Sequence, residues 1–216
     1  MKKIAACAIR MPVTGIFAAA LLALSGCALP LPDKPVRPQT YDLGPALPAV
    51  AAASVPITTP LAIGRVDAPS AIDGSQIVYR LLYGGADQQP RPYAMARWVM
   101  SPPQLVAQRL REAFAATRPV VEPGAGLAPL ELQTDIDEFA QVFRSAADSE
   151  GVVRLRMTVL APNARSGRLV GQRTFTVHKP AATADARGGV VALRAATDDV
   201  VQQVVSWVNA LPSPQP

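Results

Sequence analysis

The sequence predicts an α+β domain of two layers, in which two main helices pack on one face of an antiparallel sheet. Two observations lead to this class. Several short segments alternate apolar and polar residues, which is the signature of strands with one buried face. Two longer segments, which begin near Ser101 and Val190, repeat apolar residues every three or four positions, as amphipathic helices do. Helices gathered on one side of an antiparallel sheet give a two-layer domain.

The strands predicted before the first helix are short. Tyr41-Asp42-Leu43 is a brief candidate, and the apolar run 61–66 is the next. Apolar residues alternate along QIVYRLLY, residues 76–83, as in a half-buried strand. Gly84-Gly85 and the polar residues after it predict a turn, so that YAMARWV, residues 93–99, returns as the partner strand of a β-hairpin.

Ser101 is the predicted N-cap of the first helix, because serine is favoured there and Pro102 and Pro103 are tolerated in a first turn. The apolar stripe of this helix contains Leu105, Val106, Leu110, Ala113 and Phe114.

Three longer strands are predicted next. Residues 130–143 alternate until the apolar phase slips after Ile136, which indicates a bulge near Glu138. Residues 152–159 alternate without a break, and a turn at 162–167 leads into a returning strand at 169–177.

The last helix is predicted to begin after a turn made by Gly188-Gly189. Its apolar stripe covers one face of the sheet. The stripe contains Val190, Leu193, Val200, Val204, Trp207 or Val208, and Leu211.

The N-terminal segment has the layout of a secretory signal peptide. Lys2, Lys3 and Arg10 precede an apolar run, 12–24, that is shorter than the ~20 residues needed to span a bilayer. Leu24-Ser25-Gly26-Cys27 then resembles a bacterial lipobox, which implies cleavage before Cys27, lipidation of its thiol and acylation of the new amino terminus. The alternative is an ordinary signal peptide with a chance cysteine.

The predicted organisation is therefore a signal peptide at 1–26, a lipidated cysteine with a proline-rich tether at 27–40, a folded domain at 41–211 and a disordered tail at 212–216. A tether of polyproline type, at ~3.1 Å per residue, reaches roughly 40 Å from the lipid. Residue 28 is alanine and not aspartate, which by analogy with enterobacterial sorting predicts the outer membrane and makes the inner membrane the less favoured alternative.

Removal of residues 1–26 changes the charge and the cysteine content. It takes away three basic residues and leaves 18 basic against 16 acidic, which is no nucleic-acid footprint. It also removes Cys7, so that Cys27 is the single cysteine left. A disulfide framework and a cysteine metal site are thereby excluded.

The remaining polar residues do not form a recognisable catalytic site. His178 is the one histidine in the chain, and its strand position predicts an outward, solvated side chain. The sequence has neither a G-x-S-x-G elbow nor a G-x-x-x-x-G-K-[ST] loop. We therefore expect no enzyme activity, no metal and no cofactor.

Two carboxylate pairs and one arginine pair also favour a solvated role over chemistry. Asp135 and Asp137 share the polar face of a strand, and Asp198-Asp199 is assigned to the wet side of the last helix. Arg154 and Arg156 point outward as well, where a solvated sheet face is favoured over contact with anionic headgroups or an acidic partner.

Three stretches of the folded part resemble the ABC-type transport auxiliary lipoprotein family. They are VDAPSAIDGSQIVYRLLY, YAMARWVMSPPQLVAQRLREAF and ADARGGVVALRAATDDVVQQVVSWV. This family accompanies MCE-type lipid transporters, including Pqi-type systems. The resemblance implies a non-enzymatic accessory or docking component that meets a periplasmic MCE-domain protein with its permease and ATPase.

The exposed aromatic and basic positions of the predicted hairpin, with the turn before it, are the candidate partner-binding surface. Its members are Asp73, Gly74, Tyr79, Arg80, Arg97 and Trp98. For Tyr79 and Trp98, core packing is the alternative, and it is favoured over a surface role. A homo-oligomer is compatible with this role.

The leading function is the lipid-transport accessory, and two others compete with it. One is a free-standing structural lipoprotein that binds peptidoglycan or another envelope protein. The other is a lipid or peptidoglycan hydrolase, which the missing histidine-centred site disfavours.

Overall fold

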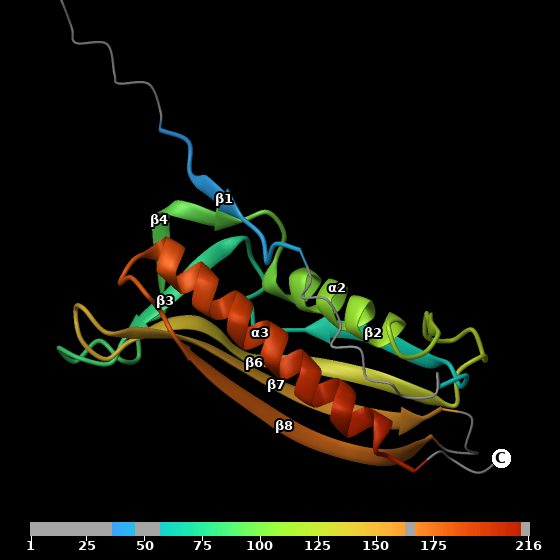
Figure 1. Cartoon of the computed structure of the whole chain (residues 1–216). Helices are drawn as coiled ribbons and strands as arrows, with labels where there is room; N and C mark the ends of the chain where they lie inside the picture. The colour runs from blue at the N-terminus through green and yellow to red at the C-terminus, as the bar shows by residue number, and fades with distance from the viewer. Residues whose placement is uncertain (1–35, 46–56, 163–166, 213–216) are drawn as a thin grey trace, which may run out of the picture. The chain divides into compact units, whose positions relative to one another are not determined.

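The computed structural model describes residues 36–45, 57–162 and 167–212 (Figure 1). The predicted signal peptide, Cys27 and most of the predicted tether lie outside these residues, as do most of the predicted turn at 162–167 and of the predicted tail. The elements, in chain order, are β1 (Gln39–Tyr41), β2 (Leu61–Asp67), β3 (Gln76–Leu81), β4 (Arg91–Trp98), α2 (Pro102–Ala115), β5 (Val120–Val121), β6 (Leu130–Phe143), β7 (Ser149–Ala161), β8 (Arg168–Pro180) and α3 (Ala186–Asn209).

The described strands form one eight-stranded sheet that is mixed, so the α+β class is confirmed but the prediction of a purely antiparallel sheet was wrong. β6 pairs with β7, and β7 with β8, in the predicted antiparallel way. On its other edge β6 takes two parallel neighbours, β2 along its first half and β3 along its last residues. Segments as far apart in the sequence as 61–67 and 130–135 thus lie side by side, which local alternation cannot reveal.

Several local predictions are confirmed. β3 and β4 pair as an antiparallel hairpin, and the register of β6 against β7 shifts between Ile136 and Glu138, at the predicted bulge. Ser101 is the N-cap of α2, and its backbone N–H donates to the Gln104 side chain at 3.2 Å. The first strand is displaced by two residues, because its parallel pairing with β4 ends at Tyr41 opposite Trp98.

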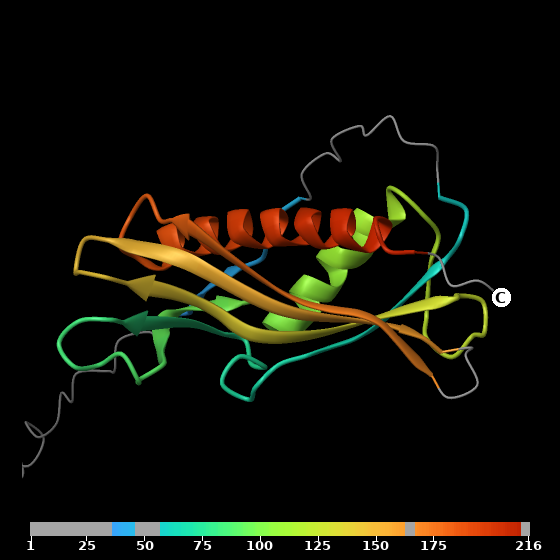
Figure 2. The ribbon, with the colours of Figure 1, turned by 90° about the horizontal axis from the view of Figure 1, so that it is seen from below.

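α3 lies along the sheet over β6, β7 and β8 and also contacts α2, which packs on β2. Figure 2 shows both helices on the same side of the sheet. The apolar stripes named from the sequence meet in this layer, where Leu110 and Phe114 of α2 and Leu193 of α3 are fully buried. The core therefore lies between the helices and the sheet.

Gly188 and Gly189 are in the first turns of α3, so the prediction that they form the turn before it was wrong. The N-cap is Asp185, whose carboxylate accepts the Gly188 N–H at 2.8 Å. A Cβ on Gly188 would clash with Thr183, and one on Gly189 with the side chain of Gln141. These glycines are thus explained by the close approach of the helix to its neighbours and not by a turn.

A third glycine, Gly151 on β7, sets the distance between α3 and the sheet. A Cβ there would lie 2.6 Å from the backbone of Ala192 and Leu193, which a side-chain rotation cannot relieve. We expect Gly151→Ala to lower the free energy of unfolding by about 3 kcal/mol, as overpacking of a tight core does. Urea unfolding measures this, with Gly74→Ala as the control, since its nearest neighbour is 4.0 Å away. A Gly151→Ala protein as stable as the control contradicts this account of the helix–sheet contact.

Candidate functional site

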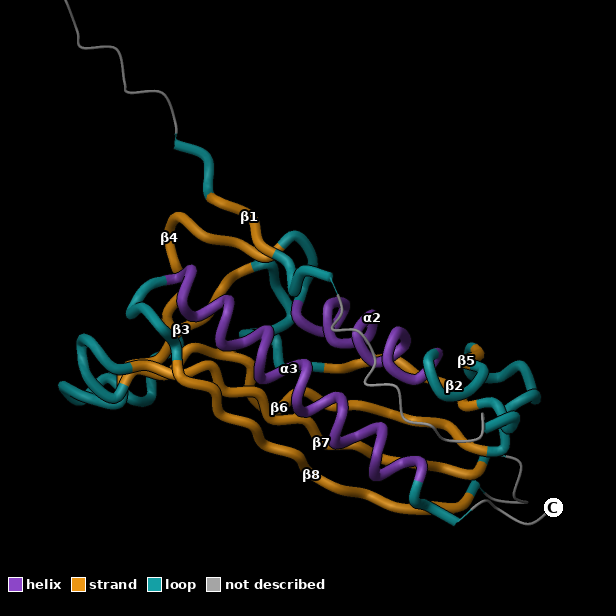
Figure 3. The backbone as a smooth tube through the Cα atoms, viewed as in Figure 1, coloured by secondary structure: helices purple, strands orange, loops and turns teal. Residues whose placement is uncertain are grey.

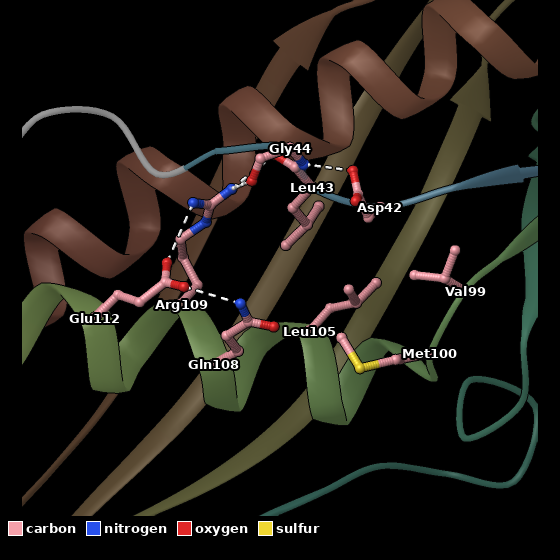
Figure 4. Close-up of a pocket in the computed structure, with 9 residues that line it drawn as sticks. All are labelled: Asp42, Leu43, Gly44, Val99, Met100, Leu105, Gln108, Arg109 and Glu112. Atoms are coloured by element: carbon pink, nitrogen blue, oxygen red, sulfur yellow. Dashed lines mark hydrogen bonds and ion pairs between the residues drawn. The ribbon is translucent and has the colours of Figure 1, made fainter.

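A cluster of four charged residues, of which Arg109 and Asp198 are buried, holds the chain where it enters the domain. The Arg109 cluster is defined as Arg109 and Glu112 of α2 with Arg194 and Asp198 of α3, and its two arginines bind residues 43–45. Figure 4 shows Arg109 and Glu112 beside Leu43 and Gly44. Arg109 is 5% exposed, and its Nη2 donates to the carbonyl oxygens of Leu43 at 2.6 Å and Gly44 at 3.0 Å. Its Nε lies 3.1 Å from Asp198 Oδ1 and its Nη1 3.4 Å from Glu112 Oε2. One guanidinium thus ties both helices to the segment after β1.

Asp198 is the acidic centre of the cluster, and the prediction that it lies on the wet side of α3 was wrong. It is 7% exposed, because Arg109 reaches it from the neighbouring helix and Arg194 lies 3.7 Å away on its own. Burial raises the pKa of the Asp198 carboxyl, while the charges of Arg109 and Arg194 oppose this rise. Asp199 differs, since it is partly exposed and pairs with Lys179 at 2.7 Å.

The segment itself is shaped to fit the cluster. Arg194 Nη2 donates to the carbonyl oxygen of Pro45 at 2.9 Å. Gly44 has a φ of 62°, where glycine is favoured, and a Cβ on it would lie 3.0 Å from Arg194 Nη1. Leu43 is 4% exposed and belongs to the core. Three consecutive carbonyls and one apolar anchor therefore fix the chain at this point.

A small pocket of about 80 Å³ opens beside the cluster. Its lining is shown in Figure 4 and consists of Asp42, Leu43, Gly44, Val99, Met100, Leu105, Gln108, Arg109 and Glu112. Pockets that bind small molecules usually measure about 300–1,000 Å³. The polar groups of Arg109 are directed at backbone carbonyls of the chain itself. The geometry therefore suits a structural clamp better than a substrate site.

The structure places the predicted partner-binding residues in two groups. Asp73 and Gly74 form the turn before β3, and this turn meets the end of β4, where the Trp98 N–H donates to the Ser75 carbonyl at 2.7 Å. Arg97 lies opposite Gln76 and so belongs with Trp98 to this first group, beside the turn. Tyr79 and Arg80, further along β3, form the second group. The six residues therefore do not form one compact site.

Trp98 is not a surface residue, so its place among the candidate contact residues was wrong and the favoured alternative of core packing holds. Its side chain is 2% exposed and packs against Phe139 with ring centroids 5.8 Å apart. Tyr79 is half-buried, with its ring 4.7 Å from that of Tyr93 and 5.8 Å from that of Phe143. Core packing, the alternative considered for both residues, holds for Trp98 and in part for Tyr79.

Most other polar candidates lie on the surface, as the sequence predicts, and the structure shows that they are paired there. Arg156 lies 3.5 Å from Asp135 and 3.3 Å from Asp137 on the open face of the sheet. Arg154 pairs in the same way with Glu138, at 3.4 Å. The side chain of His178 is half exposed, with Nδ1 3.0 Å from Glu150.

Two kinds of feature are missing from the described parts of the chain. Within residues 36–45, 57–162 and 167–212, no three His, Cys, Asp or Glu side chains are grouped as a metal site would need. Neither described helix is long and apolar enough to cross a membrane.

Solved structures that resemble this fold include three of low sequence identity. A protein of Xanthomonas campestris is 20% identical, with a TM-score of 0.68 over 79% of this chain and 94% of its own. An uncharacterized protein is 13% identical, with a TM-score of 0.60 over 80% and 99%. A hypothetical protein of Chlamydia trachomatis is 6% identical, with a TM-score of 0.50 over 72% and 98%. At these identities the likeness concerns the fold alone.

No curated protein matches the chain significantly. A family match is nevertheless clear, and it agrees with the resemblance carried by the hairpin, the proline-led helix and the last helix. The family described as ABC-type transport auxiliary lipoprotein component matches residues 41–205, from the end of β1 to within α3. The chain therefore belongs to the ABC-type transport auxiliary lipoprotein family.

Proposed function

We propose that this protein is a non-enzymatic lipoprotein of the outer membrane and the docking component of an MCE-type ABC transport system. In this proposal the system moves lipids or other hydrophobic compounds across the cell envelope. The ATPase of this system supplies energy, and its permease and periplasmic MCE-domain protein supply the path. Lipid on Cys27 anchors this chain in the outer membrane, from which its folded domain docks on the MCE-domain protein. A homo-oligomer fits the same role.

The observation that carries this proposal is the family match, which covers nearly the whole described domain and concerns a lipoprotein that assists ABC-type transport. The lipobox at Leu24-Ser25-Gly26-Cys27 supports the anchor independently. The Arg109 cluster supports a tethered role as well. It fixes residues 43–45, directly after the predicted tether, by hydrogen bonds to three carbonyls.

The turn at Asp73-Gly74 is the part of the predicted contact surface that we propose for docking. Asp73 is exposed, and the turn belongs to the segment that connects β2 to β3. Trp98 is excluded because it is buried.

Photo-cross-linking in membranes tests this function. A photoreactive residue at Asp73 is compared with one at Gln133, which is exposed on the open face of β6. We expect an adduct between the Asp73 probe and a periplasmic MCE-domain protein, and none from Gln133. An adduct from Gln133 alone contradicts the docking turn but keeps the function. Recovery of peptidoglycan or an unrelated envelope protein, with no MCE adduct from either position, overturns the function in favour of the structural lipoprotein.

A further inference from the structure

The β3–β4 hairpin carries arginines that the domain itself does not neutralise. Residues 76–99 contain Arg80, Arg91 and Arg97 against a single acid, Asp87. Within the described part of the chain, none of these guanidinium groups lies within 4.0 Å of a carboxylate oxygen. Arg80 instead donates to the backbone carbonyl of Asp87 at 2.8 Å, and Arg91 to the Gln89 side chain at 3.0 Å. Their positive charge is left for a partner.

Exposed apolar side chains accompany these arginines. Leu82 and Tyr83, directly after β3, are 50% and 38% exposed, and Met95 on β4 is 46% exposed. Val99, directly after β4, is 53% exposed. Arg154 and Arg156 on the open sheet face differ from these arginines, since each lies within 4.0 Å of at least one carboxylate oxygen. Arginine interleaved with tyrosine and aliphatic side chains suits the headgroup region of a bilayer, where charge meets phosphate and the apolar parts are partly buried.

The position of the tether indicates which partner this surface meets, because it holds the hairpin close to the membrane. β1 pairs in parallel with β4, with Thr40 opposite Arg97, so the chain that leads to Cys27 joins the domain at the edge of this hairpin (Figure 3). Only residues 28–38 separate Cys27 from β1, a span of roughly 34 Å at the ~3.1 Å per residue of a polyproline-type segment. A surface held this close to the bilayer needs little intrinsic affinity, because tethering raises its effective concentration to the order of millimolar.

We propose that the hairpin surface, meaning the exposed side chains of residues 80–99, rests on anionic phospholipid headgroups. The inference depends on the lipid anchor of the proposed function, but not on the MCE partner. It assigns Arg80 and Arg97 to lipid and leaves the turn at Asp73-Gly74 for protein docking. Neutralising an arginine near an anionic surface weakens the contact roughly fivefold, and three such changes weaken it about a hundredfold.

The test uses the lipidated protein in vesicles, where the predicted loss of Cys7 and modification of Cys27 make an introduced thiol unique. An environment-sensitive fluorophore is placed at Met95→Cys and, as the control, at Leu127→Cys, which is 66% exposed in the loop before β6. Vesicles of phosphatidylcholine alone are compared with phosphatidylcholine mixed with phosphatidylglycerol, each containing a headgroup quencher. Flotation and intact mass show separately that the protein is lipidated and vesicle-bound.

We expect quenching and a blue shift for the Met95 probe, in the anionic vesicles and at low salt, with little change for the Leu127 probe. The triple variant Arg80→Gln, Arg91→Gln, Arg97→Gln should lose the signal. The variant Arg111→Gln, Arg168→Gln, Arg173→Gln, which removes the same charge elsewhere, should keep it.

Equal signals from the two probes, or a signal independent of anionic lipid, overturns the proposal. So does a Met95 probe that responds to an added MCE-domain protein and not to lipid, since the surface is then a protein interface. A protein that fails to float or lacks the lipid mass contradicts the anchor of the proposed function, and with it this inference. A lipidated, floating protein with a silent Met95 probe contradicts the hairpin contact alone.

Discussion

Cys27→Ala should abolish the lipid-modified form of the protein. The sulfur of Cys27 is the atom to which the predicted lipid is attached, and no other cysteine follows Cys27 in the sequence. Without it, the protein is either released from membranes or kept as a precursor that retains residues 1–26. Anchoring by several acyl chains is close to permanent, whereas one chain holds only marginally, so the membrane-bound mature fraction should fall to background. Intact mass and membrane fractionation measure both effects.

The matched control for this prediction is Cys7→Ala. Cys7 lies in the predicted signal peptide, so its loss should leave the mature mass and the membrane fraction unchanged. If Cys27→Ala and Cys7→Ala give the same mature mass and the same membrane fraction, the lipobox interpretation fails. The alternative of an ordinary signal peptide would then apply.

Asp198→Ala should destabilise the domain by about 3–5 kcal/mol, because it leaves the buried Arg109 guanidinium without its closest carboxylate. That is a large share of the roughly 5–15 kcal/mol that stabilises an average domain. Arg109→Met should cost a similar amount, since it also releases the carbonyls of Leu43 and Gly44. The double variant should lose less than the sum of the two, as expected for residues in one network. Urea unfolding at neutral pH provides the measurement.

Asp199→Ala is the control for the buried pair. Asp199 is the next residue of α3, but in its ion pair with Lys179 both side chains are partly exposed to solvent. Exposed pairs contribute less than about 1 kcal/mol. If Asp198→Ala is no more costly than Asp199→Ala, or if the double variant is strictly additive, the Arg109 cluster does not hold the domain in the way described.

Features that depend on neighbouring residues in the sequence could be predicted well. The hairpin, the N-cap at Ser101 and the bulge before Glu138 each follow from local alternation or capping preference, and the structure has all three. The parallel pairing of β2 and β3 with β6 could not be predicted this way, because alternation shows which face is buried but not which distant strand lies alongside. The directions of β2 and β3 relative to β6 were therefore wrong in the predicted sheet, whereas the antiparallel pairings of β3 with β4 and of β6, β7 and β8 were right.

The Arg109 cluster could not be predicted from the sequence for a related reason. Arg109 lies four residues after Leu105 on the apolar stripe of α2, and Asp198 three residues before the buried Val201 of α3. A charge on each of two apolar stripes was a signal that the sequence contained. The two charges become a pair only when the helices are packed together, so the wet side was assigned to Asp198 on local grounds. Trp98 was named as a contact residue although core packing was the favoured alternative, and the structure places it in the core.

Co-purification in mild detergent tests the central claim most directly. The lipidated protein is isolated from membranes, and the proteins and glycan bound to it are identified by mass spectrometry. The account predicts a periplasmic MCE-domain protein, together with its permease and ATPase. Recovery of peptidoglycan or of a different envelope protein, with none of these three, would contradict it.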